Sequence, residues 1–240
     1  MRRFFADITG NEVLISGDEA HHIIDVLRLK PGEKIAVCDG CGNDCVCEIS
    51  EILGKTVSAK ILEKFASTAE AKVKVTLYQG LPKSDKMELI IQKAVELGVF
   101  EIVPVETKRC VSKIEPKKAD AKTDRWNKIS MSAAKQSGRG IIPEIKKPVS
   151  FAEAVEMMKS HDFSFAAYEE ETENTIKSEL QKNKGVKTIG FFIGPEGGIA
   201  PEEIEKIKEA GFPTVTLGER ILRTETAPLA VLSMIMYEFE

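Results

Sequence analysis

The sequence has 240 residues, of which 42% are hydrophobic and 30% charged, and its formal net charge is −4. This composition is typical of a folded globular protein, and it excludes a disordered chain or one that coats nucleic acid through overall positive charge. The apolar run 229–236 is far shorter than the roughly 20 residues of a membrane helix, so no membrane association is expected. Five cysteines in a chain without a signal peptide's apolar core indicate a cytoplasmic protein.

Short strand-like runs dominate the first 70 residues. Candidate strands separated by turn residues cover 2–6, 12–15, 33–38, 45–52 and 56–65. One helix is expected over 19–29, with Ser16 and Glu19 as a possible capping box. Many short strands predict a small β-barrel. The polar, small-residue stretch 66–72 reads as a linker, which predicts domains 1–70 and 71–240.

From Val73 onward, strands and helices alternate. Candidate strands cover 73–79, 101–105, 164–168, 187–193 and 213–217. Helices are expected to begin near residues 85, 120, 172 and 201, and a last helix covers 227–237. This alternation predicts an α/β domain with a mostly parallel sheet and helices on both faces.

Two glycine-bearing segments each follow a predicted strand. The first is Gly194-Pro195-Glu196-Gly197-Gly198, and the second runs from Leu217 to Pro228. Glycine permits positive φ and lets a ligand approach the backbone closely. Ligands of parallel α/β sheets bind beyond the carboxyl ends of the strands, where both segments would lie. Either segment alone could equally be an ordinary turn between a strand and a helix.

Together, the segments closely resemble the signatures Ile-Gly-Pro-Glu-Gly-Gly and Leu-Gly-x-x-Ile-Leu-Arg-x-Glu-Thr-Ala of the 16S ribosomal RNA uridine-N3 methyltransferases. Matches outside these signatures include Arg2-Arg3-Phe4-Phe5, His21-His22-Ile23, 92–98 and 134–139. That family belongs to the SPOUT superfamily of knotted methyltransferases. The resemblance implies a SPOUT-type domain with a trefoil knot, an N-terminal PUA-like barrel that binds RNA, and a homodimer built largely through the C-terminal domain. Its implied substrate is 16S ribosomal RNA of the small ribosomal subunit.

The resemblance also implies S-adenosyl-L-methionine as cofactor, held largely by backbone groups of the glycine segments. The side chains of Ile221 and Leu222 would contact its adenine. The implied cofactor-binding residues are Ile193, Gly194, Glu196, Gly197, Gly198, Leu217, Gly218, Ile221, Leu222 and Arg223.

Arg223 and Glu225 are the candidate catalytic residues. An arginine can stabilise charge that develops on the uracil oxygens, and a glutamate could take the N3 proton. Two alternatives stay open: the residues pair with each other, or Glu225 caps the last helix. Glu196 has the same ambiguity.

Basic residues are concentrated between Lys108 and Arg139, where ten lysines and arginines, Lys113 among them, accompany three acids. Such a patch suits docking on a phosphate backbone, although a solvated helix face is the alternative reading. The candidate RNA-binding residues are Arg2, Arg3, Arg28, Lys83, Arg109, Arg125 and Arg139. Trp126, the only tryptophan, is expected in the core.

Cys38, Cys41, Cys45 and Cys47 invite a zinc-site reading. Structural zinc sites usually use two well-separated pairs of ligands, and neighbours such as Cys45 and Cys47 on a strand should point to opposite faces. No metal site is therefore expected.

Two other functions are considered. One is a related methyltransferase with another RNA target, because a fold and a cofactor site do not fix the substrate. The other is a non-catalytic RNA-binding adaptor, although an adaptor would not need an intact pair of glycine segments.

Overall fold

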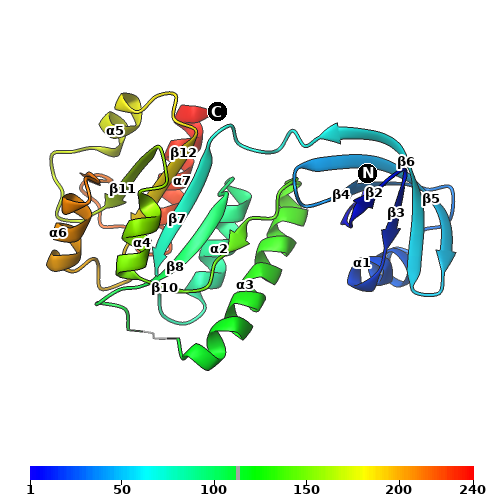
Figure 1. The fold of residues 1–240 in the computed structure, drawn as a ribbon, viewed down its shortest axis with the longest axis horizontal. Coiled ribbons are helices and arrows are strands. Elements are labelled where there is room, and N and C mark those ends of the chain that lie inside the picture. Colours follow the sequence, from blue (N-terminus) through cyan, green and yellow to red (C-terminus); the bar gives the residue numbers. More distant parts are fainter. Residues whose placement is uncertain (112–113) are drawn as a thin grey trace. The chain divides into compact units, whose positions relative to one another are not determined.

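The computed structural model describes residues 1–111 and 114–240, and the chain forms two compact units (Figure 1). The first unit comprises Met1–Glu70 and Ala134–Ile142, and the second comprises Ala71–Ala133 and Pro143–Glu240. The return of 134–142 to the first unit differs from the two continuous domains expected from the sequence. Lys113 lies outside the described residues.

The first unit contains a six-stranded sheet in the order β1-β4-β5-β6-β3-β2. Only the β1/β4 pair is parallel. The strands are β1 (Arg3–Phe5), β2 (Ile8–Thr9), β3 (Glu12–Ile15), β4 (Lys34–Cys38), β5 (Asn43–Leu53) and β6 (Thr56–Ala66). The five expected strands are therefore confirmed to within two residues at each end, and β2 was not anticipated. Alternating apolar residues of these strands form the core of the unit.

The helical segment of this unit differs from the expected helix 19–29. It consists of α1 (Gly17–His21) and a π-helical turn, His22–Val26. The predicted capping box is wrong, because the Ser16 side chain makes no capping hydrogen bond. The carboxylate of Glu19 instead lies 2.7 Å from Lys135 Nζ.

The expectation that Cys45 and Cys47 point to opposite faces is wrong, because residues two apart on a strand lie on the same face. The pairing of β5 with β6 shifts register between Val46 and Cys47, and both Cys45 and Cys47 are buried in the same core. Burial raises the pKa of the Cys47 thiol to about 11, so it remains protonated at neutral pH.

Segment 134–142 is held in the first unit by buried polar contacts. Arg139 is 3% exposed, and its Nη2 lies 2.6 Å from Glu70 Oε2. Glu70 Oε1 also accepts hydrogen bonds from the backbone N–H groups of Gly140 and Ile141. Arg3 donates to the carbonyl oxygens of Gly138 and Arg139 and pairs with Asp44 at 2.7 Å. The RNA-contact role expected for Arg139 does not fit this burial, and Arg3 is committed to the same structural network.

The second unit is built on a seven-stranded parallel sheet. Its strands follow the order β10-β8-β7-β12-β11-β13, and β9 also pairs with β8. They are β7 (Lys74–Gly80), β8 (Glu101–Glu106), β9 (Glu144–Ile145), β10 (Val149–Ser150), β11 (Phe163–Ala167), β12 (Thr188–Ile193) and β13 (Thr214–Val215). The expected parallel α/β domain is confirmed, and β9 and β10 are additions to it.

The helices of this unit are α2 (Lys86–Glu96), α3 (Pro116–Ser137), α4 (Phe151–Met158), α5 (Ile176–Lys182), α6 (Pro201–Glu209) and α7 (Ala227–Phe239). α2, α6 and α7 begin within one residue of the expected positions, whereas α3 and α5 begin four residues away from them. The last turn of α3 belongs to the first unit. Trp126 on α3 is 3% exposed, which confirms its expected core position.

Helix α4 was not anticipated. Its N-terminus carries a complete capping box, in which Ser150 and Glu153 bond to each other's backbone N–H groups. Phe151, Ala154 and Met158 on one side of α4 are buried in a core cluster. These features explain why this short segment is helical.

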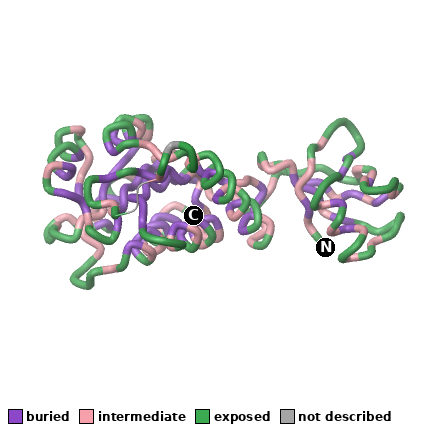
Figure 2. The backbone as a smooth tube through the Cα atoms, turned by 90° about the horizontal axis from the view of Figure 1, so that it is seen from below, coloured by how far each residue is buried: buried purple, intermediate pink, exposed green. Residues whose placement is uncertain are grey.

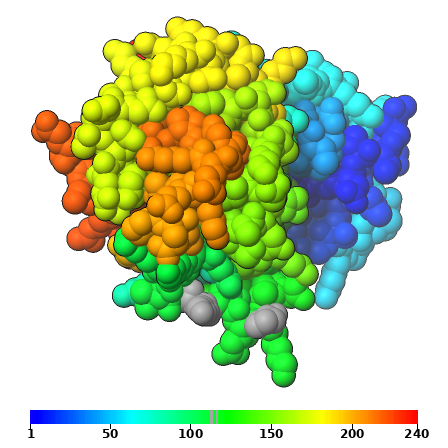
Figure 3. Space-filling view, turned by 60° about the vertical axis from the view of Figure 1, so that its left-hand side comes forward, coloured from blue at the N-terminus to red at the C-terminus, as the bar shows by residue number. Residues whose placement is uncertain are grey.

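Helices cover both faces of the parallel sheet, and buried residues follow its strands (Figure 2). Tyr78 and Phe192 join the core cluster beneath α4 and α6, which lie side by side (Figure 3). Their neighbours Leu77 and Phe191 alternate to the other face, where α7 packs against β7 and α2. Among the described residues, no helix is both long and apolar enough to cross a bilayer.

Candidate active site

The two glycine-bearing segments lie at the carboxyl edge of the parallel sheet. β12 ends at Ile193 and β13 at Val215, and both strands pair with β11. Ile193 is also paired with Gln79 near the end of β7. Because all these strands run in the same direction, the segments that follow them emerge at one edge.

Glycines let the first segment pack tightly. A Cβ on Gly80 would lie 2.7 Å from the backbone nitrogen of Pro195, so β7 can accept the segment only with glycine there. Gly198 has φ +70°, and a Cβ on it would lie 2.0 Å from Glu169 Oε1. Of the three glycines in this segment, only Gly198 has positive φ, so the conformational freedom expected for Gly194 and Gly197 is not used.

A single hydroxyl links the two segments. Thr224 Oγ1 donates a hydrogen bond to the carbonyl oxygen of Gly194 at 2.8 Å and accepts one from Gln79 Nε2 at 3.1 Å. Thr224 is 6% exposed and Gln79 is fully buried. Gln79 Oε1 is buried without a hydrogen-bond partner among the described residues. A buried acceptor of this kind is costly unless a ligand or water satisfies it.

Lys86, in the first turn of α2, forms a second link. Its Nζ lies 3.0 Å from Glu196 Oε1 and 3.3 Å from Glu225 Oε2. The backbone N–H of Lys83 also donates to Glu196, at 3.1 Å. Burial opposes ionisation of Glu196, but the hydrogen bonds from Lys86 and Lys83 hold the pKa of this carboxyl below its ordinary value. Hydrogen bonding to Glu196 is the largest cause that raises the pKa of Lys86, so both groups are charged at neutral pH.

The catalytic candidates Arg223 and Glu225 differ in exposure. The Arg223 side chain is 83% exposed and that of Glu225 is 17% exposed, and 3.9 Å separates Arg223 Nη1 from Glu225 Oε1. Glu225 Oε2 is buried, and its partner among the residues that the structure describes is Lys86 Nζ at 3.3 Å. Arg223 and Glu225 therefore form only a long contact with each other. Lys86 lies closer to Glu225, at 3.3 Å.

The stretch 218–221 of the second segment is exposed to solvent. Ile221 is 87% exposed, and Gly218 is exposed with φ +105°. Leu217 and Leu222 are partly buried. The expected adenine contacts of Ile221 and Leu222 remain predictions.

The segment after β8 borders the first glycine segment. Arg109 Nη1 donates to the carbonyl oxygen of Gly197 at 3.0 Å. The backbone N–H of Lys108 donates to Glu203 Oε1 at 2.8 Å, and the other oxygen of Glu203 accepts from Ala200 N. Lys108 and Arg109, which follow β8, thus hold both the first glycine segment and the start of α6 in place. The sequence analysis did not single out six residues of this site: Gln79, Gly80, Lys86, Glu169, Glu203 and Thr224. Only Thr224 lies within a recognisable motif, the second signature.

The remaining candidate RNA-binding residues are exposed, but they are not all unpaired. In the second unit, Lys83 and Arg109 are exposed, and Arg125 pairs with Glu88 at 2.8 Å. In the first unit, Arg2 and Arg28 are exposed. Within the basic window, Arg109 and Arg125 are exposed, whereas Arg139 is buried.

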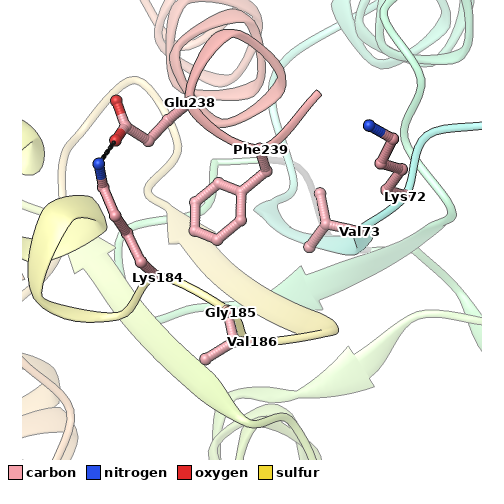
Figure 4. A pocket seen from close by; sticks show the side chains of 7 residues that line it. All are labelled: Lys72, Val73, Lys184, Gly185, Val186, Glu238 and Phe239. Carbon is pink, nitrogen blue, oxygen red and sulfur yellow. Dashed lines mark ion pairs between the residues drawn. The ribbon is translucent and has the colours of Figure 1, made fainter.

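A pocket of about 280 Å³ lies at the opposite edge of the parallel sheet (Figure 4). It is lined by residues that precede β7 and β12 and by the end of α7: Lys72, Val73, Lys184, Gly185, Val186, Glu238 and Phe239. Lys184 Nζ is paired with Glu238 at 3.0 Å, so part of its charge is neutralised. This pocket belongs to the amino ends of the strands and is separate from the glycine segments.

The cysteine cluster is dispersed. Cys38, Cys45 and Cys47 are buried, whereas Cys41 is exposed. Within the ranges that the structure describes, no three His, Cys, Asp or Glu side chains are arranged to hold a metal ion.

Comparisons with known proteins identify the family. A family model described as an RNA methyltransferase domain matches residues 69–236, and one described as an RNA methyltransferase PUA domain matches residues 15–62. The chain is 37% identical to ribosomal RNA small subunit methyltransferase E of Bacillus subtilis (strain 168), a match that covers 100% of this chain and 98% of that protein. It is 32% identical to the protein of the same name from Aquifex aeolicus (strain VF5), with 95% of each chain covered.

Solved structures agree. The crystal structure of ribosomal RNA small subunit methyltransferase E from Neisseria gonorrhoeae bound to S-adenosyl methionine is 32% identical. It matches with a TM-score of 0.88 over 99% of this chain and 97% of that chain. The fold expected from the resemblance, a methyltransferase domain that follows a PUA-like domain, is confirmed by these matches. The chain therefore belongs to the RNA methyltransferase family that includes ribosomal RNA small subunit methyltransferase E.

Proposed function

We propose that this protein transfers a methyl group from S-adenosyl-L-methionine to N3 of a uridine in 16S ribosomal RNA of the small ribosomal subunit. The observation that carries the proposal is the pair of glycine-bearing segments joined by Thr224 at the carboxyl edge of the sheet. They lie in a chain whose relatives are named for small-subunit ribosomal RNA methylation, one of them solved with S-adenosyl methionine.

The residues at this edge fit the cofactor. Gly80 and Gly198 occupy positions where a side chain would meet Pro195 and Glu169, so glycine there lets the first segment lie close to β7 and Glu169. Gln79 Oε1 is a buried acceptor without a protein donor in the described part of the chain, and a ligand donor would satisfy it. The residues proposed to hold the cofactor are Ile193, Gly194, Glu196, Gly197, Gly198, Leu217, Gly218, Ile221, Leu222 and Arg223.

When bound, S-adenosyl-L-methionine supplies a methyl group already activated on a sulfonium. The protein then has to orient the uridine and remove its N3 proton, and orientation alone can lower a barrier by about 7–11 kcal/mol. Glu225 would accept the proton: the N–H bond breaks, its electron pair stays on N3, and a carboxyl O–H forms. The methyl group that N3 takes up would be released from the sulfonium, whose S–CH3 bond electrons stay on sulfur as a neutral thioether. Arg223, whose side chain is 83% exposed, donates to the uracil oxygens, where negative charge develops.

The remaining features extend the proposal. The RNA-binding PUA-like domain, the SPOUT methyltransferase domain, the trefoil knot and the homodimer follow from the resemblance. The boundary between domains 1–70 and 71–240 follows from the linker composition, and the structure adds 134–142 to the first unit. Arg2, Arg28, Lys83, Arg109 and Arg125 would contact RNA phosphates, and all five are exposed. A cytoplasmic location is supported by five free cysteines.

Nucleoside analysis of ribosomal RNA by mass spectrometry provides the test. RNA from a strain that lacks the gene should lose one N3-methyluridine, and purified protein should restore it. Loss of a different modified nucleoside would indicate another RNA target, and RNA binding without methyl transfer would indicate an adaptor.

Calorimetric titration tests the cofactor site directly. S-adenosyl-L-methionine should bind with micromolar affinity, about 8 kcal/mol. A Cβ on Gly197 would lie 3.1 Å from Arg109 Cβ, so Gly197→Val should crowd the segment and abolish binding while the fold is kept. Normal titration of this variant would contradict the assignment.

A further inference from the structure

The contacts of Lys86 connect parts of the site that the sequence places far apart. Its ammonium lies between a carboxylate of each segment, Glu196 in the first and Glu225 in the second. The Lys86 side chain is 35% exposed, and those of Glu196 and Glu225 are 24% and 17% exposed. A fully exposed ion pair contributes little to stability. Lys86 instead contacts two partly buried carboxylates at the edge of the proposed cofactor site, so it can fix their positions.

The two contacts differ in length and in the other donors to each carboxylate. Glu196 is held by hydrogen bonds from both Lys86 and the backbone N–H of Lys83, so its position is fixed. Glu225 Oε2 lies farther from Lys86 Nζ, at 3.3 Å, and no second donor holds it among the described residues. Lys86 thus orients the Glu225 carboxylate from one side and leaves it with unused acceptor capacity. A carboxylate needs this capacity to accept a proton from a substrate.

We propose that Lys86 is a positioning residue for methyl transfer. It holds the Glu225 carboxylate of the second glycine-bearing segment in place relative to Glu196 of the first. This inference rests on the proposed function and adds to it a residue from α2. Lys86 keeps its own proton, because its pKa is raised, chiefly by the hydrogen bond to Glu196. Its role is therefore to place Glu225 and balance its charge, and proton transfer takes place at Glu225 itself.

A purely structural role and a positioning role of Lys86 predict different effects on cofactor binding and on the rate of methyl transfer. Thr224 and Gly194 join the two segments independently of Lys86, so the cofactor site should survive its loss. Orientation of Glu225 should not survive. Removal of Lys86 should therefore slow the chemical step much more than it weakens cofactor binding.

The experiment uses the full chain and small ribosomal subunits from a strain that lacks the gene. Single-turnover methyl transfer is measured at saturating cofactor for the wild type, Lys86→Met and Lys86→Arg. Lys93→Met is the matched control, since Lys93 lies on the same helix and pairs only with its neighbour Glu96 in the described contacts. We expect Lys86→Met to react at least about tenfold more slowly, with the cofactor Kd raised no more than about threefold. Lys93→Met should react normally, and Lys86→Arg should recover part of the rate.

A double-mutant cycle with Glu225→Gln shows whether Lys86 acts through Glu225. If it does, adding Lys86→Met to Glu225→Gln should slow the reaction no further. Equal slowing by Lys86→Met in both backgrounds would overturn the proposal, and so would a wild-type rate for Lys86→Met. If Lys86→Met does not fold, Lys86→Gln, which keeps a donor without the charge, takes its place with the same expected results.

The wild-type reaction separates this inference from the function on which it rests. If wild-type protein transfers no methyl group to the small subunit, the proposed function is wrong. If the wild type is active and Lys86→Met is equally active, only the role of Lys86 is wrong.

Discussion

Thr224 Oγ1 donates a 2.8 Å hydrogen bond to the carbonyl oxygen of Gly194, so one buried hydroxyl joins two segments that are 30 residues apart in the sequence. The same oxygen accepts from Gln79 Nε2. The geometry of the glycine segments therefore depends on a threonine as well as on the glycines themselves.

Replacement of Thr224 by valine should separate the segments. The change leaves the Gly194 carbonyl without this donor and Gln79 Nε2 without this acceptor, which should lower the free energy of unfolding by about 1–3 kcal/mol. Cofactor affinity should fall roughly tenfold, the equivalent of about 1.4 kcal/mol. Denaturant unfolding and calorimetry measure the two effects. Thr224→Ser keeps the hydroxyl and should behave nearly as the wild type; an equal loss in Thr224→Ser would show that the methyl group matters instead.

Gly198→Ala should weaken cofactor binding through crowding. Gly198 and Gly211 both have positive φ, +70° and +86°, so alanine at either should cost about 1–2 kcal/mol of stability through backbone strain. Only at Gly198 would the new Cβ meet another side chain, the carboxylate of Glu169. Gly198→Ala should therefore reduce cofactor affinity in a titration and Gly211→Ala should not. Adding Glu169→Ala to Gly198→Ala should restore part of the affinity.

Arg223→Ala should cut the rate of methyl transfer by about 10²-fold or more, the scale of losing one preorganised donor. Because the side chain is 83% exposed, the unfolding midpoint should not change. Lysine should restore little activity, since it lacks the planar fork of arginine. Near-normal turnover in Arg223→Ala would remove this residue from the mechanism.

Glu225→Gln distinguishes a base from a structural partner. As the base, it should lower the single-turnover rate while cofactor affinity is kept. As a helix-end partner, it would instead lower stability by about 1 kcal/mol with the rate unchanged. Rapid-quench kinetics and thermal unfolding of the same preparation decide between the two.

Two arginines of the basic window should respond in opposite ways. Arg139→Ala breaks a buried pair with Glu70 and should lower the free energy of unfolding by about 3–5 kcal/mol. Arg125 pairs with Glu88 with 66% of its side chain exposed, so Arg125→Ala should change stability by less than about 1 kcal/mol. It should instead flatten the salt dependence of RNA binding, by about 0.7–0.9 in log–log slope for a lost phosphate contact. An unchanged slope would assign Arg125 to the solvated helix face.

Stability should fall in mildly acidic solution because of His161. Burial holds the pKa of this histidine below 6.5, and the Tyr78 hydroxyl lies 2.8 Å from its Nε2. The unfolded chain then binds the proton more readily, so the free energy of unfolding should decrease as the pH falls below about 6.5. His161→Gln should reduce this pH dependence, whereas His21→Gln at an exposed site should retain it. Denaturant titrations between pH 5 and 8, the range in which histidine changes charge, measure the difference.

The strand pattern could be predicted because alternation and turn residues are local. β3 agrees residue for residue with the expected strand, and β12 differs by one residue at its start. Capping boxes show the limit of such reasoning. Ser16 and Glu19 match the motif, yet Glu19 pairs with Lys135, whereas the box that forms is Ser150 with Glu153. A distant ion pair competes for the glutamate, and no local pattern reveals it.

The candidate site was predictable to the extent that its backbone carries glycine signatures. The residues that join the signatures were not predictable, because Gln79, Lys86 and Thr224 meet only after the sheet has formed. Charge along the sequence was similarly a poor guide to exposure. Arg125 and Arg139 belong to the same basic window, but one is in solvent and the other is 3% exposed.

The return of 134–142 to the first unit makes that unit discontinuous in the sequence. Glu70 ends the first stretch of chain, and the guanidinium that neutralises it comes from Arg139 in the second. Cys41 and Ile141 also form a bridge between these two stretches. The N-terminal unit is consequently not a detachable module. Residues 1–70 expressed alone would expose a carboxylate and core surface that Ala134–Ile142 covers, and an exchange of this unit between relatives would have to transfer both pieces of chain together.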